Sequence, residues 1–272
     1  MNAAENPTLK GLIIDMDGVL WRDHEPIGDL PAIFKRIREL GLRTILATNN
    51  ATRTVEDYFM KLAGFGVDLD SWQIINSAKA VGIFLSEHYP ENIRVYVVGE
   101  ESLKKTLSGF GINVVDDSEK DVAVVVGSLD YHLTYEKLKH ASLLIQAGAD
   151  FIGSNPDKTL PTPEGFIPGS GTVIGALEIA SGKQAKMIGK PEPLLYEMAL
   201  KRLGTNPEAT LAIGDRLETD IAGAQAAGIH TALVLTGAST REQAAAYHPA
   251  PEMIAENLTE LIDDELTKNF NL

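Results

Sequence analysis

Cysteine is absent from all 272 residues, which excludes disulfides, thiolate metal sites and a cysteine nucleophile. A chain without disulfides suits a reducing compartment, so we expect a cytoplasmic protein. Long apolar runs are also missing, and the longest fall far short of the roughly 20 residues that a membrane-spanning helix needs. Residues 1–10 carry Asn, Glu and Pro ahead of a very short apolar run, unlike a signal peptide. We therefore expect no membrane partner.

Positive charge is scarce as well. The chain has 24 Lys and Arg residues against 38 Asp and Glu, a formal net charge of −14 and a pI of about 4.8. Such a chain repels nucleic acid, so we expect no nucleic-acid partner. An anionic substrate would need a locally positive site built from a metal ion, a Lys side chain or helix N-termini. With 44% hydrophobic and 23% charged residues, the composition is that of a globular protein.

Short apolar runs alternate with segments of helical periodicity, which predicts α/β architecture with a parallel sheet. The expected strands are 12–14, 44–47, 94–98, 113–115, 122–126, 151–152, 210–213 and 231–235. The expected helices are 30–40, 54–62, 101–107, 135–146, 193–203, 219–227 and a terminal amphipathic helix at 251–266. The Pro- and Gly-rich segment 155–171 is too long for a simple connector.

Polar residues follow the strands of the first and third series, where open α/β sheets place their sites. The middle series has a strong strand of its own and can fold as an inserted domain. The sequence thus predicts a Rossmann-like core domain, 1–78 and 187–272, and an inserted α/β domain, 79–186.

Asp15 and Asp17 come directly after the first expected strand, and alternation places both on one side of the extended chain. Two such carboxylates repel unless a cation lies between them or one holds a proton. Mg²⁺ favours one or two carboxylates together with water and phosphate oxygens. A carboxylate can also attack phosphorus itself. Taken alone, the same residues could merely form an Asp-Gly turn.

Three further segments carry polar groups at strand ends or helix starts. Thr48 and Asn49 could cradle a phosphate, although an ordinary helix cap looks the same. Lys190 could neutralise phosphate charge or be a solvated surface lysine. Asp220 could be no more than a helix cap. Asp215 ends a buried strand and needs a partner, for which a metal ion shared with Asp15 and Asp17 is one answer.

The four segments occur in the order DMDGVLW, ATNNATR, GKPEP and GDRLETDI. This set closely resembles the haloacid dehalogenase-like phosphatase superfamily, and within it the NagD-type or 4-nitrophenylphosphatase branch. The resemblance covers the whole chain, because the middle series matches the large α/β cap of this branch.

The resemblance implies a role for each matching residue. Asp15 would be the nucleophile, and Asp17 the general acid and later the general base. Asp15, the Asp17 backbone carbonyl and Asp215 would bind Mg²⁺, with Asp220 supporting them. Thr48, the Asn49 backbone and Lys190 would hold the phosphoryl group. Asn155 and Asp157 of the cap are candidates for contacting the leaving group.

The expected activity is that of a phosphoric monoester hydrolase acting on a small phosphorylated metabolite. Two alternatives stay open: a phosphotransferase or phosphomutase with the same motifs, and a phospho-acceptor regulatory module with a long-lived phosphoaspartate. The sequence leaves the substrate open. It also leaves open a homodimer formed through the cap, which this branch often adopts.

Overall fold

The computed structural model describes residues 7–162 and 164–272. Residues 1–6 of the expected core domain and residue 163 of the expected cap lie outside the described part. The chain divides into two compact units: the first comprises Met1–Thr48, Val55–Ile75 and Lys190–Leu272, and the second Asn49–Thr54 and Asn76–Gly189. The sequence-based division lies at 78/79 and 186/187 and leaves Asn49–Thr54 in the core.

The first unit is built on a six-stranded sheet in the order β15-β14-β13-β1-β4-β5. Its strands are β1 (Gly11–Ile14), β4 (Arg43–Thr48), β5 (Ile74–Asn76), β13 (Thr210–Gly214), β14 (His230–Val234) and β15 (Met253–Ala255). The five strands from β4 to β15 pair in parallel. A hairpin of β2 (Trp21–Arg22) and β3 (Glu25–Pro26) follows β1.

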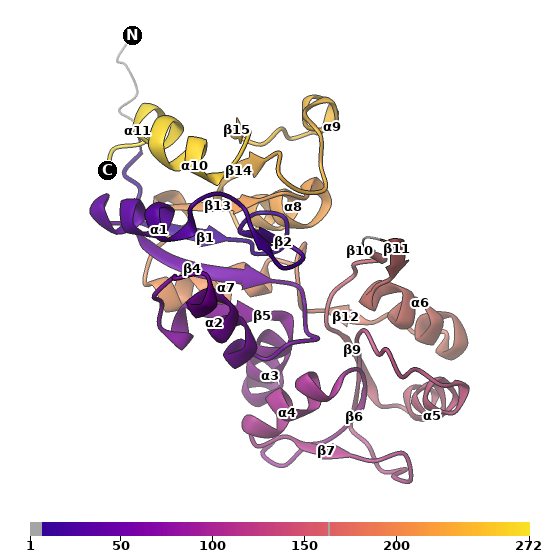
Figure 1. The fold of residues 1–272 in the computed structure, drawn as a ribbon. Helices are drawn as coiled ribbons and strands as arrows, with labels where there is room; N and C mark the ends of the chain where they lie inside the picture. The colour runs from indigo at the N-terminus through magenta and orange to yellow at the C-terminus, as the bar shows by residue number, and fades with distance from the viewer. Residues whose placement is uncertain (1–6, 163) are drawn as a thin grey trace. The chain divides into compact units, whose positions relative to one another are not determined.

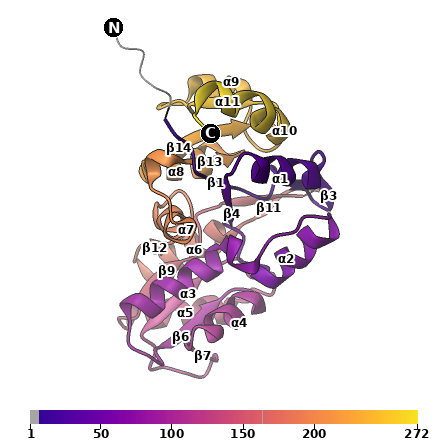
Figure 2. The ribbon, with the colours of Figure 1, turned by 90° about the vertical axis from the view of Figure 1, so that its left-hand side faces the viewer.

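Helices cover both faces of this sheet, which explains why every residue of its central strands β1 and β13 is buried (Figures 1 and 2). One face packs against α1 (Leu30–Glu39), α2 (Val55–Gly64) and the C-terminal helices α10 (Leu258–Glu260), η4 (Leu261–Glu265) and α11 (Leu266–Asn269). The other contacts α7 (Leu194–Leu203) and α8 (Ala222–Ala226). Shorter elements are η1 (Ser71–Gln73), η2 (Pro207–Ala209), η3 (Leu217–Ile221) and α9 (Arg241–Ala246).

The second unit has its own five-stranded parallel sheet in the order β12-β9-β8-β6-β7. Its strands are β6 (Arg94–Val98), β7 (Asn113–Val115), β8 (Val124–Gly127), β9 (Asp150–Gly153) and β12 (Lys186–Met187). The helices are α3 (Ser77–His88), α4 (Glu101–Gly109), α5 (Tyr135–Gln146) and α6 (Ser170–Ser181). Helices α5 and α6 share one hydrophobic cluster with the sheet. The predicted fold class, a Rossmann-like core with an inserted α/β domain, is confirmed.

The structure corrects the prediction in several places. The tail 251–266 does not begin as a helix, because Met253–Ala255 pairs with β14 as the edge strand β15. Segment 155–171 contains a hairpin of β10 (Thr159–Thr162) and β11 (Gly165–Pro168) and the start of α6. Helices α3 and α6 were not predicted. In the described part of the chain, no helix combines the length and apolar character that crossing a bilayer requires.

Candidate active site

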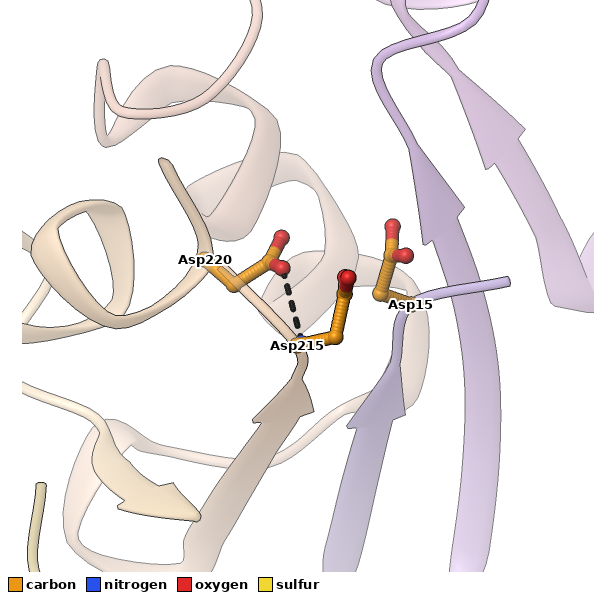
Figure 3. A group of neighbouring side chains, drawn as sticks. All are labelled: Asp15, Asp215 and Asp220. Atoms are coloured by element: carbon orange, nitrogen blue, oxygen red, sulfur yellow. Dashed lines mark hydrogen bonds between the residues drawn. The ribbon is translucent and has the colours of Figure 1, made fainter. Parts of the chain in front are cut away.

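Strands β1 and β13 lie side by side at the centre of the first sheet, where the direction of strand addition reverses. This is the position at which open α/β sheets bind ligands, outside the carboxyl ends of the strands. Asp15 directly follows β1 and donates its backbone N–H to the Ile213 carbonyl at 2.8 Å. Asp215 directly follows β13, so the two carboxylates leave neighbouring strand ends together (Figure 3). Both side chains are buried.

Asp220 joins them from the π-helical turn η3, which follows β13. Its Oδ2 accepts the backbone N–H groups of Asp215 at 3.1 Å and Arg216 at 3.0 Å, and the first of these is the dashed line in Figure 3. π-turns of this kind are frequent at functional sites. The turn brings Asp220 so close to β13 that a Cβ at Gly214 would lie 2.2 Å from the Asp220 Cβ. The glycine of the GD motif is therefore required by this approach.

Lys190 is the counter-charge of the group, and its side chain is only 2% exposed. Its Nζ donates to Asp15 Oδ1 at 2.6 Å, to Asp220 Oδ1 at 2.6 Å and to the Ala47 carbonyl at 3.0 Å. An ammonium has three protons to donate, so these three acceptors use all of them. Lys190 is thus a buried part of the acidic cluster and not a solvated surface lysine.

The electrostatics of the cluster are unbalanced, because three buried carboxylates face one ammonium. Burial alone would lower the pKa of Lys190, but the Asp15 and Asp220 carboxylates raise it well above its ordinary value, so the ammonium stays charged. Burial raises the pKa of Asp15 well above its usual range, and the other carboxylates add to this against the opposing effect of Lys190. Burial, with the charge of Asp220, also raises the pKa of Asp215 to about 7. A further cation would stabilise all three ionised carboxylates.

The oxygens of this group fit a divalent cation. Asp15, Asp215 and Asp220 each offer a carboxylate oxygen within 4.8 Å of the others. Asp215 Oδ2 accepts the Ala238 backbone N–H at 2.6 Å, whereas its buried Oδ1 has no hydrogen-bond partner among the residues that the structure describes. Both oxygens of Asp220 already accept hydrogen bonds. Carboxylate oxygens are the ligands that Mg²⁺ prefers, and the orphaned oxygen marks Asp215 as the ligand best placed to receive it.

Asp17 does not belong to this buried group. Its side chain is exposed, and its Oδ1 accepts the indole N–H of Trp21 at 2.8 Å. We expected Asp15 and Asp17 to lie on one side of an extended chain. The chain is not extended over these residues, because β1 ends at Ile14 and a tight turn follows at Gly18, where φ is +85°. A carboxyl group that is open to solvent beside a buried carboxylate suits proton exchange with a substrate.

The predicted phosphate and leaving-group residues fall in both units. Thr48 is buried at the end of β4. The second unit contains Asn49, Asn155 and Asp157. The Asn49 side-chain N–H donates a hydrogen bond to Asp157 Oδ2 at 3.1 Å. Asn155 is 2% exposed, and its Nδ2 donates to the Asn49 carbonyl at 2.7 Å and to the hydroxyls of Ser154 and Ser170. These bonds occupy the Asn155 amide and favour a role in shaping the segment around Asn49.

Sequence reasoning missed two contributions to the site. The loop after β14 supplies the Ala238 N–H to Asp215, and Thr236 Oγ1 donates to the Gly18 carbonyl at 2.5 Å. The buried Tyr196 hydroxyl donates to the Asp220 carbonyl at 2.9 Å. The loop could have been found from its place at the carboxyl end of a core strand. Tyr196 carries no such signal, because it looks like any buried residue of α7.

We expect Gly214→Ala to lower the free energy of unfolding by about 1–3 kcal/mol, because the added methyl group would overlap Asp220. Gly64→Ala is the matched control in the same unit, at the end of α2 with nothing within 4 Å of an added Cβ. Urea unfolding of both variants tests this. Equal stability of the two variants would show that the packing of Asp220 against β13 is looser than the structure indicates.

The site geometry is that of an α/β enzyme with a buried acidic cluster at the switch point of its sheet. Known proteins match the chain over nearly its full length. Residues 12–113 match a family described as haloacid dehalogenase-like hydrolase, and residues 187–261 match one described as HAD-hydrolase-like. The 5'-nucleotidase YutF of Bacillus subtilis is 33% identical over 255 residues, which cover 94% of this chain and 98% of that protein.

Solved structures agree with these sequence matches. A p-nitrophenyl phosphatase from Archaeoglobus fulgidus has a TM-score of 0.88 at 31% identity and covers 94% of this chain and 99% of its own. The glycerol phosphate phosphatase Rv1692 from Mycobacterium tuberculosis, solved in complex with magnesium, has a TM-score of 0.86 at 32% identity. The match covers 93% of this chain and 76% of that protein. The chain belongs to the haloacid dehalogenase-like hydrolase family, in the phosphatase branch that includes NagD from E. coli K-12.

Proposed function

We propose that the chain is a Mg²⁺-dependent phosphatase that hydrolyses phosphate monoesters of small metabolites through an aspartyl-phosphate intermediate on Asp15. The observation that carries this proposal is the meeting of Asp15 with Lys190 and Asp215, which are far apart in the sequence, at the switch point of the sheet. Family membership supports the reaction class, and the names of the relatives support phosphate esters as substrates.

In the first half-reaction, a carboxylate oxygen of Asp15 attacks the phosphorus of the ester. A new bond between this oxygen and phosphorus forms while the bond from phosphorus to the ester oxygen breaks. Asp17 donates its proton to the departing oxygen, so the alcohol leaves uncharged. Lys190 holds Asp15 in place and neutralises charge that gathers on the phosphoryl oxygens.

In the second half-reaction, water attacks the phosphorus of the aspartyl phosphate. Asp17, now a carboxylate, accepts a proton from this water as general base. The bond between phosphorus and Asp15 breaks, inorganic phosphate departs, and the Asp15 carboxylate is regenerated. Dividing one difficult displacement into two steps is the advantage of a covalent nucleophile. Uncatalysed hydrolysis of phosphate monoesters is slow enough to need up to about 10²¹-fold acceleration.

Asp15, Asp215 and the Asp17 backbone carbonyl would hold the Mg²⁺ ion, and Asp220 would support them through Lys190 and the Asp215 N–H. The fit rests on the orphaned Asp215 oxygen and on the excess of buried carboxylates over ammonium groups. When bound, the ion would neutralise phosphoryl oxygens and keep the carboxylates ionised.

We further propose that the first unit is the catalytic core and the second the cap. Thr48 and the Asn49 backbone would bind phosphoryl oxygens, since they follow β4, the strand beside β1. Asp157 would be the cap residue that contacts the leaving group. Asn155, whose amide is already hydrogen-bonded, would hold the segment around Asn49 in shape.

We also propose that the second unit associates with a second copy of the chain. A cytoplasmic location is part of the same proposal. Five large hydrophobic side chains of that unit are at least half exposed, and self-association would remove part of this apolar area from water: Tyr131, Tyr135, Leu143, Phe166 and Ile179. Sedimentation equilibrium distinguishes monomer from dimer.

A screen of phosphate esters tests the function directly. With Mg²⁺ present, we expect repeated release of inorganic phosphate from at least one sugar phosphate, nucleoside monophosphate, glycerol phosphate or aryl phosphate. Transfer of the phosphoryl group to a second sugar would favour a phosphomutase or phosphotransferase. A phosphorylated protein that accumulates without turnover would favour a regulatory module, although Asp17 argues against it by offering a base for the hydrolysis step.

A further inference from the structure

Asp17 needs a defined orientation to serve as an acid, yet it lies on an exposed turn. Exposed carboxylates rotate freely about their side-chain bonds unless a partner fixes them. The hydrogen bond from Trp21 Nε1 to Asp17 Oδ1, at 2.8 Å, supplies such a partner four residues away. The same two residues are joined by a backbone bridge.

Trp21 is itself held rigidly. Its side chain is 0% exposed and stacks on Tyr58, with ring centroids 6.2 Å apart and planes 15° apart. Phe65 packs beside it at 6.1 Å, and Lys61 Nζ lies 4.0 Å from its ring. An indole fixed on its faces in this way can point its N–H group in only one direction.

The indole N–H is a donor that cannot accept, so Asp17 Oδ1 must remain an acceptor. A buried Trp usually needs a partner for its N–H, which would make the contact merely structural. The partner here is an exposed carboxylate that the proposed mechanism uses, and this distinguishes Trp21 from an ordinary core residue.

We propose that Trp21 is a positioning residue for Asp17, whose indole N–H fixes the carboxyl group in the orientation that delivers a proton to the leaving oxygen. The inference rests on the proposed function. It predicts a selective defect, because only leaving groups that need a proton depend on this orientation. Alkyl phosphates release a strongly basic alkoxide oxygen, whereas 4-nitrophenyl phosphate releases a stable phenolate.

The test compares kcat/KM of Trp21→Phe on an alkyl phosphate and on 4-nitrophenyl phosphate, since kcat/KM reports the steps up to loss of the leaving group and not the later hydrolysis. We expect a loss of about 10- to 100-fold for the alkyl phosphate. We expect a loss of roughly threefold or less for 4-nitrophenyl phosphate. Phe65→Leu, which disturbs the same aromatic packing and leaves the N–H group intact, should affect both substrates equally.

An equal loss on both substrates in Trp21→Phe would overturn the proposal. If that variant does not fold, a benzothiophene analogue of tryptophan at position 21, in a Trp72→Phe background, replaces N–H by sulfur with little change of shape. This variant should again lose more kcat/KM on the alkyl phosphate than on 4-nitrophenyl phosphate. The chain has two Trp residues, so incorporation is confined to position 21.

A second readout does not depend on turnover. In metal-free protein, Asp17→Ala should move the indole N–H resonance of Trp21 upfield in an NMR spectrum, with the assignment taken from Trp72→Phe. An unmoved resonance would show that the hydrogen bond is absent and would overturn the proposal. If the resonance moves but the wild-type protein releases phosphate from none of the esters in the screen, the proposed function is wrong and the catalytic role of Trp21 falls with it.

Discussion

Asp15→Asn is expected to lower kcat on any phosphate ester by at least about 10⁴-fold. The amide has nearly the same shape as the carboxylate but is not a nucleophile. Its oxygen can still accept from Lys190, which donates to Asp15 Oδ1 at 2.6 Å in the native site. The variant should therefore fold, and the loss should appear in steady-state release of phosphate with Mg²⁺ present.

Asp130→Asn is the matched control for this substitution. Asp130 is also a buried carboxylate paired with a lysine, since Lys137 Nζ lies 2.7 Å from its Oδ2 in the second unit. Breaking that pair should lower stability by a few kcal/mol at most and leave kcat within a few-fold of the wild-type value. Comparable losses of turnover in both variants would mean that Asp15→Asn loses activity because it misfolds, and not because Asp15 is the nucleophile.

Asp215→Asn is expected to separate metal binding from stability. Mg²⁺ at about 100 times its Kd should stabilise the wild-type protein by about 2.7 kcal/mol, because the ion binds the native state alone. The variant should show no such gain, and its Mg²⁺ affinity and activity should fall at least about 100-fold. Thermal unfolding with and without Mg²⁺, beside activity in EDTA and after Mg²⁺ is restored, measures these effects.

Without metal, Asp215→Asn should be about 1–3 kcal/mol more stable than the wild-type protein, because it removes one of three crowded buried carboxylates. Asp263→Asn is the control, because Asp263 is an exposed acid near Arg36. This substitution should change neither the stability of the metal-free protein nor its stabilisation by Mg²⁺. A metal-free variant that is less stable than the wild type, together with an unchanged response to Mg²⁺, would contradict the assignment of a cation to this cluster.

The sequence predicted the strands that carry the site well. The apolar run 12–14 ends directly at Asp15, and the run 210–213 is separated from Asp215 only by Gly214, so short runs followed by acids are a strong local signal. The tail was harder, because Met253–Ala255 is an edge strand of three residues whose extended form depends on pairing with β14. A short strand of this kind is fixed by tertiary contacts and not by its own periodicity.

The finer geometry of the site lay beyond the sequence for the same reason. Nothing local indicates that Lys190 is buried with all three protons used, or that Asp220 sits on a π-helical turn. The hydrogen bond from Trp21 to Asp17 requires the turn at Gly18, which bends the chain back on itself. Motif order predicted which residues would meet, and only the folded chain shows how each oxygen is occupied.

Chemical trapping of the phosphorylated residue tests the central claim most directly. Protein mixed with substrate and Mg²⁺ and quenched during turnover is reduced with borohydride, which converts an aspartyl phosphate to homoserine. Mass spectrometry of the peptides should then find homoserine at position 15 in the wild-type protein and none in Asp15→Asn. Vigorous phosphate release with no homoserine at position 15, or with the mark on another acid, would contradict the covalent mechanism.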